Sequence, residues 1–270
     1  MTHDMTGKVA IVTGATQGLG AAIARELARR GAAALVITGR NRTRGEAVAA
    51  SIMAASSTQV AFVPAELHDV AACREVVAQT DRRFGRVDTL VNSAGSTDRG
   101  TILDTTPELF DAIFAVNVRA PFFLMQDCIK LMRRDGIEGT IVNIGSMSAL
   151  AGQPFIAAYS ASKGALGTLT RNTAYALLRN RIRVNALHIG WMASDGEDRI
   201  QREYHGADED WLAAAAQNQP AGRLIDPVEV ARAVAFLATS ESGLMTGSVI
   251  EYDQAIWGAY ETAPAPQRPL

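Results

Sequence analysis

Cysteine is scarce in this chain of 270 residues. Its two cysteines, Cys73 and Cys128, lie in separate apolar segments and form neither a CxxC pair nor a Cys/His spacing. A disulfide framework or a thiolate metal centre is therefore not expected. Isolated thiols suit a reducing compartment, so we expect a cytoplasmic protein without a bound metal.

An excess of one charge and long apolar runs are also missing. The formal net charge is −2, with both signs scattered along the chain, which argues against a nucleic-acid surface or an anchor to anionic lipid. No uninterrupted apolar run reaches the roughly 18 residues of a membrane span, and no basic segment with an apolar core precedes Val9. We expect a small-molecule partner, with no nucleic acid and no membrane.

Short β-branched runs alternate with longer segments of helical periodicity. The expected strands are 9–12, 35–38, 60–63, 89–92, 140–144, 182–186 and 248–252. Strands that are apolar on both faces, separated by helices such as 21–30 and 71–84, imply a parallel sheet covered on both sides. The prediction is a doubly wound, Rossmann-type α/β fold of about seven strands with helices on both faces.

We expect a single domain over residues 1–270, because no internal repeat or low-complexity linker interrupts this alternation. With 48% apolar residues the chain can bury a sizeable core. The Pro-rich tail 262–270 lacks periodicity, and we expect it to be loosely ordered or packed against a neighbouring subunit.

A glycine-rich turn follows the first expected strand. Gly14, Gly18 and Gly20 stand in a G-x-x-x-G-x-G spacing directly before a helical segment. Glycines let the backbone approach a pyrophosphate, and the helix N-terminus offers free N–H groups and the positive end of its dipole. This position between a first strand and a first helix predicts an anion site.

Ser146, Tyr159 and Lys163 form a second pattern, with Tyr159 and Lys163 four residues apart on an expected helix. Such residues share one helix face. An ammonium beside a phenol favours the phenolate and is expected to lower the phenol pKa from roughly 10. Only three lysines occur among 26 Lys and Arg residues, and a cation that had only to be solvated would more readily be arginine.

Together these patterns resemble the short-chain dehydrogenase/reductase family over about residues 6–254. The matching segments are the glycine signature 13–20, Asn92-Ser93-Ala94-Gly95, the helix-borne Asn117, the S-x12-Y-x3-K spacing of Ser146, Tyr159 and Lys163, and Arg183-Val184-Asn185-Ala186. The resemblance implies an NAD(P)(H)-dependent oxidoreductase that interconverts a carbonyl and a secondary alcohol.

The resemblance also implies the catalytic roles. Tyr159 would exchange a proton with the substrate oxygen, because hydride delivery to a carbonyl generates an alkoxide that must be protonated. Ser146 would hydrogen-bond the same oxygen, and Lys163 would hold the nicotinamide ribose and depress the pKa of Tyr159. Asn117 would anchor a water that links Lys163 to solvent.

The implied cofactor-binding set is larger. It comprises Gly14, Thr16, Gln17, Gly18, Leu19, Gly20, Arg40, Glu66, Leu67, Asn92, Ala94, Gly95, Tyr159, Lys163, Ile189, Gly190, Met192 and Ser194. Asn92 is expected to stabilise the middle of the sheet through backbone bonds, as much as to serve the site. Ile189 replaces the proline usual in the family, and Ser194 replaces a frequent threonine that bonds the carboxamide.

The end of the second expected strand bears on the choice of nicotinamide. Gly39 stands where an NAD-preferring relative would carry Asp, and Arg40 follows it. An arginine there pairs with the 2′-phosphate of NADP, so NADP(H) is favoured, with NAD possible. Gln17 weighs against this, because many NADP-preferring relatives carry a basic residue at that position.

Residues 191–223 are long, polar and rich in aromatic residues, and in the family this region closes over substrate. Its polarity favours a small polar substrate, namely a sugar, polyol or hydroxy acid. His188, just before it, is interpreted as a packed or surface histidine rather than an acid/base group.

Three further expectations concern assembly and alternatives. Small residues after Tyr159 and the final strand favour a homotetramer, with a dimer open. A 3-ketoacyl-[acyl-carrier-protein] reductase is an alternative activity. The other alternative is a non-catalytic nicotinamide-binding regulator, although such proteins typically lose Tyr or Lys, and this chain keeps both.

Overall fold

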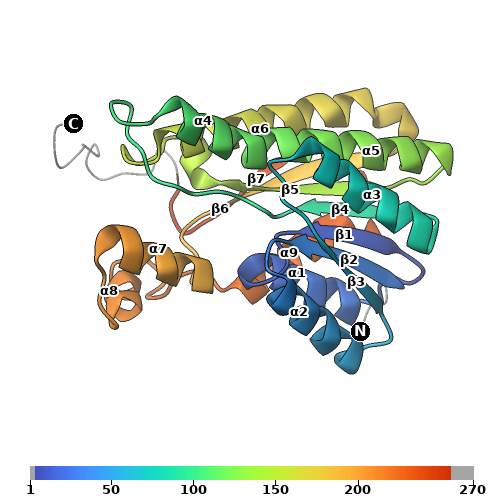
Figure 1. The fold of residues 1–270 in the computed structure, drawn as a ribbon, viewed down its shortest axis with the longest axis horizontal. Helices are drawn as coiled ribbons and strands as arrows, with labels where there is room; N and C mark the ends of the chain where they lie inside the picture. Colours follow the sequence, from blue (N-terminus) through green and yellow to red (C-terminus); the bar gives the residue numbers. More distant parts are fainter. Residues whose placement is uncertain (1–3, 257–270) are drawn as a thin grey trace.

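A computed structural model describes residues 4–256 of the chain (Figure 1). Its centre is a seven-stranded parallel sheet in the order β3-β2-β1-β4-β5-β6-β7. The strands are β1 Val9–Thr13, β2 Ala34–Gly39, β3 Gln59–Pro64, β4 Thr89–Asn92, β5 Thr140–Ser146, β6 Arg183–Ile189 and β7 Val249–Tyr252. All seven expected strands and the Rossmann-type architecture are confirmed.

The strand order reverses beside β1. From β1 the chain builds outward through β2 and β3, then crosses to β4 on the other side of β1, where Val12 pairs in register with Val91. The loops that follow β1 and β4 therefore leave the sheet in opposite directions. In open α/β sheets this arrangement opens a crevice at the carboxyl ends of the strands, where ligands bind.

Helices cover both faces of the sheet (Figure 1). On one face lie α1 Gly18–Arg29, α2 Arg42–Ala55 and α9 Pro227–Ala238, and on the other α3 Val70–Phe84, α4 Pro107–Phe114, α5 Ala120–Arg134 and α6 Ala157–Ala176. A π-helical turn η1 Ala115–Arg119 joins α4 to α5, and short 3-10 turns occur at η2 Met147–Ala149, η3 Leu178–Asn180 and η4 Ser240–Ser242.

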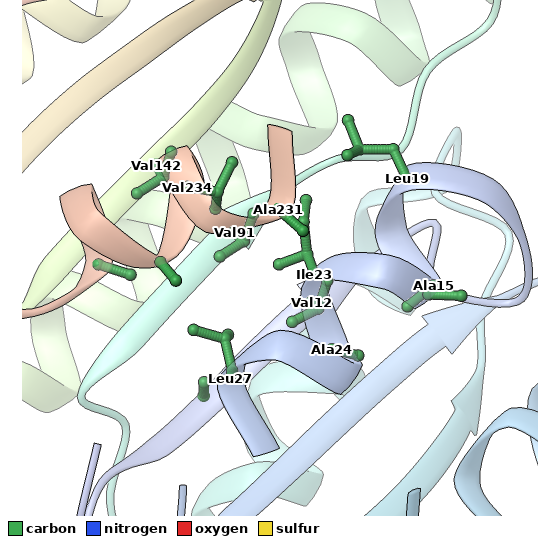
Figure 2. Close-up of a cluster of buried hydrophobic side chains, with 14 of the residues drawn as sticks. Val12, Ala15, Leu19, Ile23, Ala24, Leu27, Val91, Val142, Ala231 and Val234 are labelled. Atoms are coloured by element: carbon green, nitrogen blue, oxygen red, sulfur yellow. The ribbon is translucent and has the colours of Figure 1, made fainter. Parts of the chain in front are cut away.

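Successive residues of each strand serve opposite cores. Val91 packs in one hydrophobic cluster with Ile23 of α1 and Val234 of α9 (Figure 2), whereas its neighbour Leu90 packs in the other with Leu124 of α5. These side chains are fully buried or nearly so. Each such side chain contributes roughly 1.5–3 kcal/mol of burial free energy, which holds the sheet rigid beneath the crevice.

The helical run Pro107–Arg134 is the one helix among residues 4–256 that has the length and composition of a membrane span. It is 28 residues long with a mean hydropathy of 1.3 over an 18-residue window, so by length and composition it could cross a membrane. Helices on the sheet of an α/β domain pass the same test, and Leu124, Met125, Cys128 and Met132 of this run pack in a core cluster. The run is a core helix. The few charged residues within it interrupt its apolar sequence, so it contains no uninterrupted apolar stretch of membrane-span length.

The polar segment 191–223 folds into two helices, α7 Asp195–His205 and α8 Trp211–Gln217, which lie beside each other beyond the carboxyl end of β6 (Figure 1). Trp211, Ala215 and Leu224 form a small apolar cluster there. Trp211 also stacks on Trp191, with ring centres 6.3 Å apart. We call residues 191–223 the lid. The Pro-rich tail 262–270 lies outside the described residues.

Candidate active site at the carboxyl edge of the sheet

The glycine turn between β1 and α1 needs glycine for steric reasons. Gly14 has φ +66°, and a Cβ there would lie 2.8 Å from the Cα of Ala94. A Cβ on Gly20 would lie 2.4 Å from the carbonyl oxygen of Gly14. The turn therefore packs backbone against backbone, as a phosphate cradle requires.

Thr13 fixes this cradle to the turn after β4. Its Oγ1 accepts hydrogen bonds from the backbone N–H groups of Ser93 and Ala94, both at 3.0 Å. Gln17, the N-cap of α1, makes no side-chain capping bond, so the first N–H groups of α1 remain available to an anion. These features fit the pyrophosphate of a nicotinamide dinucleotide.

Tyr159 and Lys163 lie together on the first turns of α6, as expected. The Nζ of Lys163 is 5.7 Å from the centre of the Tyr159 ring and donates a 2.8 Å hydrogen bond to the carbonyl of Ile144. The Lys163 side chain is buried, and burial lowers its pKa to about 8. Ser146, at the end of β5, lies close enough to Tyr159 to lower the pKa of its phenol, so the three residues are brought together.

The expected lowering of the Tyr159 pKa is wrong for this structure. Burial raises the pKa of Tyr159 above its ordinary value. The nearby Ser146 hydroxyl and Arg99 guanidinium lower it in part, and the Glu197 carboxylate raises it. Desolvation therefore outweighs the favourable interactions, because a phenolate loses hydration when it is buried.

Asn117 sits in the π-helical turn η1, with its side chain fully buried. Its Oδ1 accepts from the backbone N–H of Ser96 at 2.8 Å, and its Nδ2 donates to the Ser96 carbonyl at 2.9 Å and to Ser162 Oγ at 3.0 Å. Gly95 lies between Asn117 and Lys163, since a Cβ there would be 3.5 Å from Asn117 Oδ1 and 3.6 Å from Lys163 Nζ. A water linked to Lys163 would have to hydrogen-bond the backbone of Asn117, because the side-chain amide already bonds Ser96 and Ser162.

Asn92 at the end of β4 serves the sheet, as expected, but through its side chain. Its Nδ2 donates to Asn143 Oδ1 at 2.8 Å, and Asn143 Nδ2 donates to Thr170 Oγ1 at 2.9 Å. This buried polar chain ties β4 and β5 to the helix that carries Tyr159. Asn92 Oδ1 has no hydrogen-bond partner among the described residues, so the network is satisfied in part, and its bonded members fix the strands relative to the helix.

The end of β2 places the residues expected to read the adenosine ribose. A Cβ on Gly39 would lie 2.6 Å from Thr16 Cγ2, so Thr16 fills the space that a carboxylate at position 39 would need. Arg40 is exposed. A second arginine, Arg44 of α2, reaches the cradle instead and donates a hydrogen bond to Gln17.

The other expected cofactor residues line the edge of this region. Leu19, Leu67 and Ile189 are buried, whereas Glu66 is exposed, with an oxygen 3.6 Å from His68 Nδ1. Gly190 donates its N–H to the Tyr252 carbonyl at 3.0 Å. In the lid, Met192 bridges to Ile225, and Ser194 caps α7 by accepting from Glu197 N–H at 3.2 Å.

His188 is a packed histidine, as interpreted. It lies on β6 opposite Gly145, is 4% exposed, and neither ring nitrogen has a hydrogen-bond partner among the described residues. Burial lowers its pKa to about 4, with smaller contributions from Lys163 and Arg171. The imidazole is therefore neutral at physiological pH.

Arg99 is the site residue that sequence reasoning missed. Its guanidinium lies between the rings of Phe155 and Tyr204, 5.4 and 5.9 Å from their centres, and 3.5 Å from His205 Nε2. Gly100 next to it is bridged to Ile156, just before α6. Arg99 thus connects the loop after β4 with the segment just before α6 and with the lid. Its position four residues beyond the 92–95 turn was the only signal, and no local sequence pattern marks it.

The chain was compared with known proteins. A sequence profile described as Enoyl-(Acyl carrier protein) reductase matches residues 14–254. Versicolorin reductase 1 of Aspergillus parasiticus is 37% identical over 256 residues, which cover 93% of this chain and 97% of that protein. The chain belongs to the short-chain dehydrogenase/reductase family.

Further short-chain dehydrogenase/reductase matches cover almost the whole chain. The NADP-dependent (R)-specific alcohol dehydrogenase of Lentilactobacillus kefiri is 34% identical, over 94% of this chain and 98% of that protein. The crystal structure of a 3-oxoacyl (acyl-carrier-protein) reductase from Agrobacterium tumefaciens with NADP bound has a TM-score of 0.84 at 27% identity, covering 94% of this chain and 96% of that one. The protein is an oxidoreductase of carbonyl and alcohol groups that uses a nicotinamide cofactor.

Proposed function

We propose that this protein is an NADP(H)-dependent carbonyl reductase or alcohol dehydrogenase for a small polar substrate. The observation that carries the proposal is the grouping of Ser146, Tyr159 and Lys163 at the carboxyl edge of the sheet, next to the glycine cradle. A phenol close to the Ser146 hydroxyl can donate a proton to a substrate oxygen that both groups contact.

In the reductive direction a bound nicotinamide supplies hydride to the carbonyl carbon. Tyr159 gives its phenolic proton to the carbonyl oxygen as negative charge develops there, and Ser146 Oγ holds that oxygen by a hydrogen bond. Lys163 stabilises the phenolate that results and lies near enough to Asn117 to receive a proton by way of bound water. The products are an alcohol and a reprotonated Tyr159.

Three features support NADP(H) over NAD(H). Thr16 occupies the space that a carboxylate side chain at position 39 would need to bind the adenosine ribose. Arg40 and Arg44 bring two guanidiniums to the start of α2, and guanidinium is the side chain that best matches a phosphate. The names of two relatives, an NADP-dependent alcohol dehydrogenase and a reductase with NADP bound, point the same way.

The groups around Tyr159 support a hydroxylated substrate. Arg99 is a donor and Glu197 an acceptor, and both are close enough to affect the Tyr159 pKa. Glu197 is held by Trp191 Nε1 at 2.8 Å and by Gln201 Nε2 at 2.7 Å. A charged donor and a charged acceptor beside one reactive oxygen suit a sugar, polyol or hydroxy acid.

A second candidate is reduction of a 3-oxoacyl group carried by acyl carrier protein, because one structural neighbour is named as such a reductase.

For assembly we propose a homotetramer, with a dimer as the alternative, because β7 is an edge strand and Phe122 and Tyr175 are exposed on α5 and α6. Cys73 and Cys128 are free thiols, which suits the proposed cytoplasmic location.

A substrate panel tests the proposal. Sugars, polyols, hydroxy acids, simple ketones and 3-oxoacyl-acyl carrier protein are incubated with NADPH, NADP, NADH or NAD, and the absorbance of reduced nicotinamide is followed. Turnover of polar substrates with NADP(H) supports it. Turnover of the acyl carrier substrate alone favours the second candidate. Tight NADPH binding without turnover of any substrate would favour a non-catalytic regulator.

A further inference from the structure

A pocket of about 520 Å³ lies on the outer side of the glycine turn, between α1, α2 and the lid helix α7. Its walls include Thr16 and Gln17 of the turn and three arginines, Arg25, Arg44 and Arg199, from three different helices. The site described above assigns Thr16, Gln17 and Arg44 to the cofactor but gives Arg25 and Arg199 no role.

The pocket carries more positive charge than its own residues balance. Asp195 is the one carboxylate among the described residues that line the pocket. Within residues 4–256, neither Arg25 nor Arg199 has an ion pair or a hydrogen bond, and Arg44 bonds only the neutral Gln17 and its own helix cap Asn41 through its backbone. All three arginines are exposed at the rim of the same pocket, and an anion bound among them would offset their mutual repulsion.

The lid helix rests on the phosphate cradle at this pocket. A Cβ on Gly18 would lie 3.9 Å from the Cβ of Ser194, and a Cβ on Gly196 would lie 3.9 Å from Gln17 Nε2. The first turn of α7 therefore contacts the first turn of α1. Arg199 follows one helical turn after Asp195 on the same face, which brings it to the pocket.

The second arginine of α7 behaves differently. Arg202 lies on the same helix but forms an ion pair with Asp198 at 2.9 Å, and Asp198 is also bonded to Trp211 Nε1 at 2.7 Å. Arg202 thus stabilises the lid itself, whereas Arg199 is left for an external anion. The two residues form a natural pair of test and control.

We propose that Arg199 of the lid, with Arg25 and Arg44, binds a phosphate group of the dinucleotide cofactor and so couples cofactor binding to lid position. The inference rests on the proposed use of NADP(H). Guanidinium groups match phosphate oxygens in geometry and charge. Because linkage is reciprocal, a lid held by the cofactor phosphate must also tighten the cofactor.

The first test measures cofactor binding without substrate. The dissociation constants of NADPH and NADH are measured by fluorescence titration for wild type, Arg199→Gln and the control Arg202→Gln. We expect Arg199→Gln to weaken NADPH about tenfold or more, as loss of a charged phosphate contact does, with Arg199→Lys intermediate and Arg202→Gln within about twofold of wild type.

Comparison of NADPH with NADH distinguishes a contact to the 2′-phosphate from a contact to the pyrophosphate. Weakening of NADPH alone assigns the contact to the 2′-phosphate, and equal weakening of both dinucleotides assigns it to the pyrophosphate; either result supports the inference. Unchanged affinities in Arg199→Gln, with wild type binding tightly, would overturn it and leave the proposed reductase intact. Failure of wild type to bind any dinucleotide would overturn the proposed function itself.

Hydrogen exchange across residues 195–217 tests the coupling. We expect NADPH to protect these amides in wild type and in Arg202→Gln, and to protect them much less in Arg199→Gln at saturating NADPH. Equal protection in all three proteins would show that the lid responds to the cofactor without Arg199, and would contradict the coupling. Melting curves of the apo proteins confirm that the variants fold.

Discussion

The Nζ of Lys163 lies over the ring of Tyr159, 5.7 Å from its centre, and donates its hydrogen bond to the Ile144 carbonyl. Burial shifts the pKa values of the two groups in opposite directions and apart, that of Tyr159 upward and that of Lys163 down to about 8. At neutral pH the pair therefore holds a phenol and an ammonium, the protonation state needed to give a proton to a substrate oxygen.

Removal of the phenol tests its proton transfer. Tyr159→Phe keeps the ring beside Lys163 but removes the hydroxyl, so we expect kcat to fall by about 10²–10⁴ or more. The dissociation constant of NADPH is expected to stay within about threefold, because the ring packing is kept. Single-turnover rates and fluorescence titration provide the two numbers. Unchanged turnover would remove Tyr159 from the mechanism, and Tyr175→Phe, an exposed change on the same helix, is the control.

The pH dependence of reduction should report Lys163. Its pKa of about 8 means that the ammonium is lost as pH rises through that value, and with it a charge that stabilises the phenolate formed during proton donation. We expect kcat/KM for carbonyl reduction to be highest below pH 8 and to fall above it. Lys163→Arg, which stays charged, should shift this fall to higher pH, although its absolute rate will be lower. A wild-type profile that is flat from pH 6 to 9.5 would contradict the assignment.

The fold and the grouping of Tyr159 with Lys163 could be predicted from sequence because both depend on local pattern. The β-branched runs appear as strands β1 to β7, and Tyr159 and Lys163 share a helix face whatever surrounds them. The sign of the Tyr159 pKa shift could not be predicted, because it depends on burial by segments far along the chain. The lid helices were missed for a similar reason: α7 is almost wholly polar, and its apolar support comes from Trp191 and the α8 residue Trp211.

Position 39 should resist a simple change of cofactor preference. An Asp there would be expected to favour NAD(H), but its Cβ would lie 2.6 Å from Thr16 Cγ2. We expect Gly39→Asp alone to disturb the turn and weaken both cofactors, and Gly39→Asp with Thr16→Ala to lower the NADPH/NADH ratio of kcat/KM about tenfold or more. Thr16→Ala alone is the control. If Gly39→Asp alone shifts the cofactor preference toward NADH as strongly as the double change does, Thr16 does not block the space that a carboxylate at position 39 needs.

Asn117 should contribute strongly to stability. Asn117→Ala would remove both hydrogen bonds to the half-buried backbone of Ser96 and one of the two bonds of the buried Ser162 hydroxyl, which keeps its bond to the Tyr159 carbonyl. We expect the free energy of unfolding to fall by about 2–4 kcal/mol, measured by urea denaturation. Asn172→Ala, on the exposed face of α6, should change it by less than about 0.5 kcal/mol. Equal effects of the two changes would show that the Asn117 bonds are not needed to hold the loop after β4.

Protonation of His188 should destabilise the protein on acidification. The folded-state pKa of about 4 lies below the ordinary value of 6.5, so the unfolded chain binds the proton first. The neutral imidazole thus contributes stability that is present above pH 6.5 and is lost as pH falls toward 4. Between pH 7 and 5 the loss from this group should be about 2 kcal/mol. His188→Leu should remove that part of the pH dependence, whatever its effect at pH 7, whereas His68→Leu at an exposed position should leave it unchanged. Denaturation curves at pH 7, 6 and 5 give the slopes, and parallel slopes for wild type and His188→Leu would mean that the buried ring already has a partner for its proton.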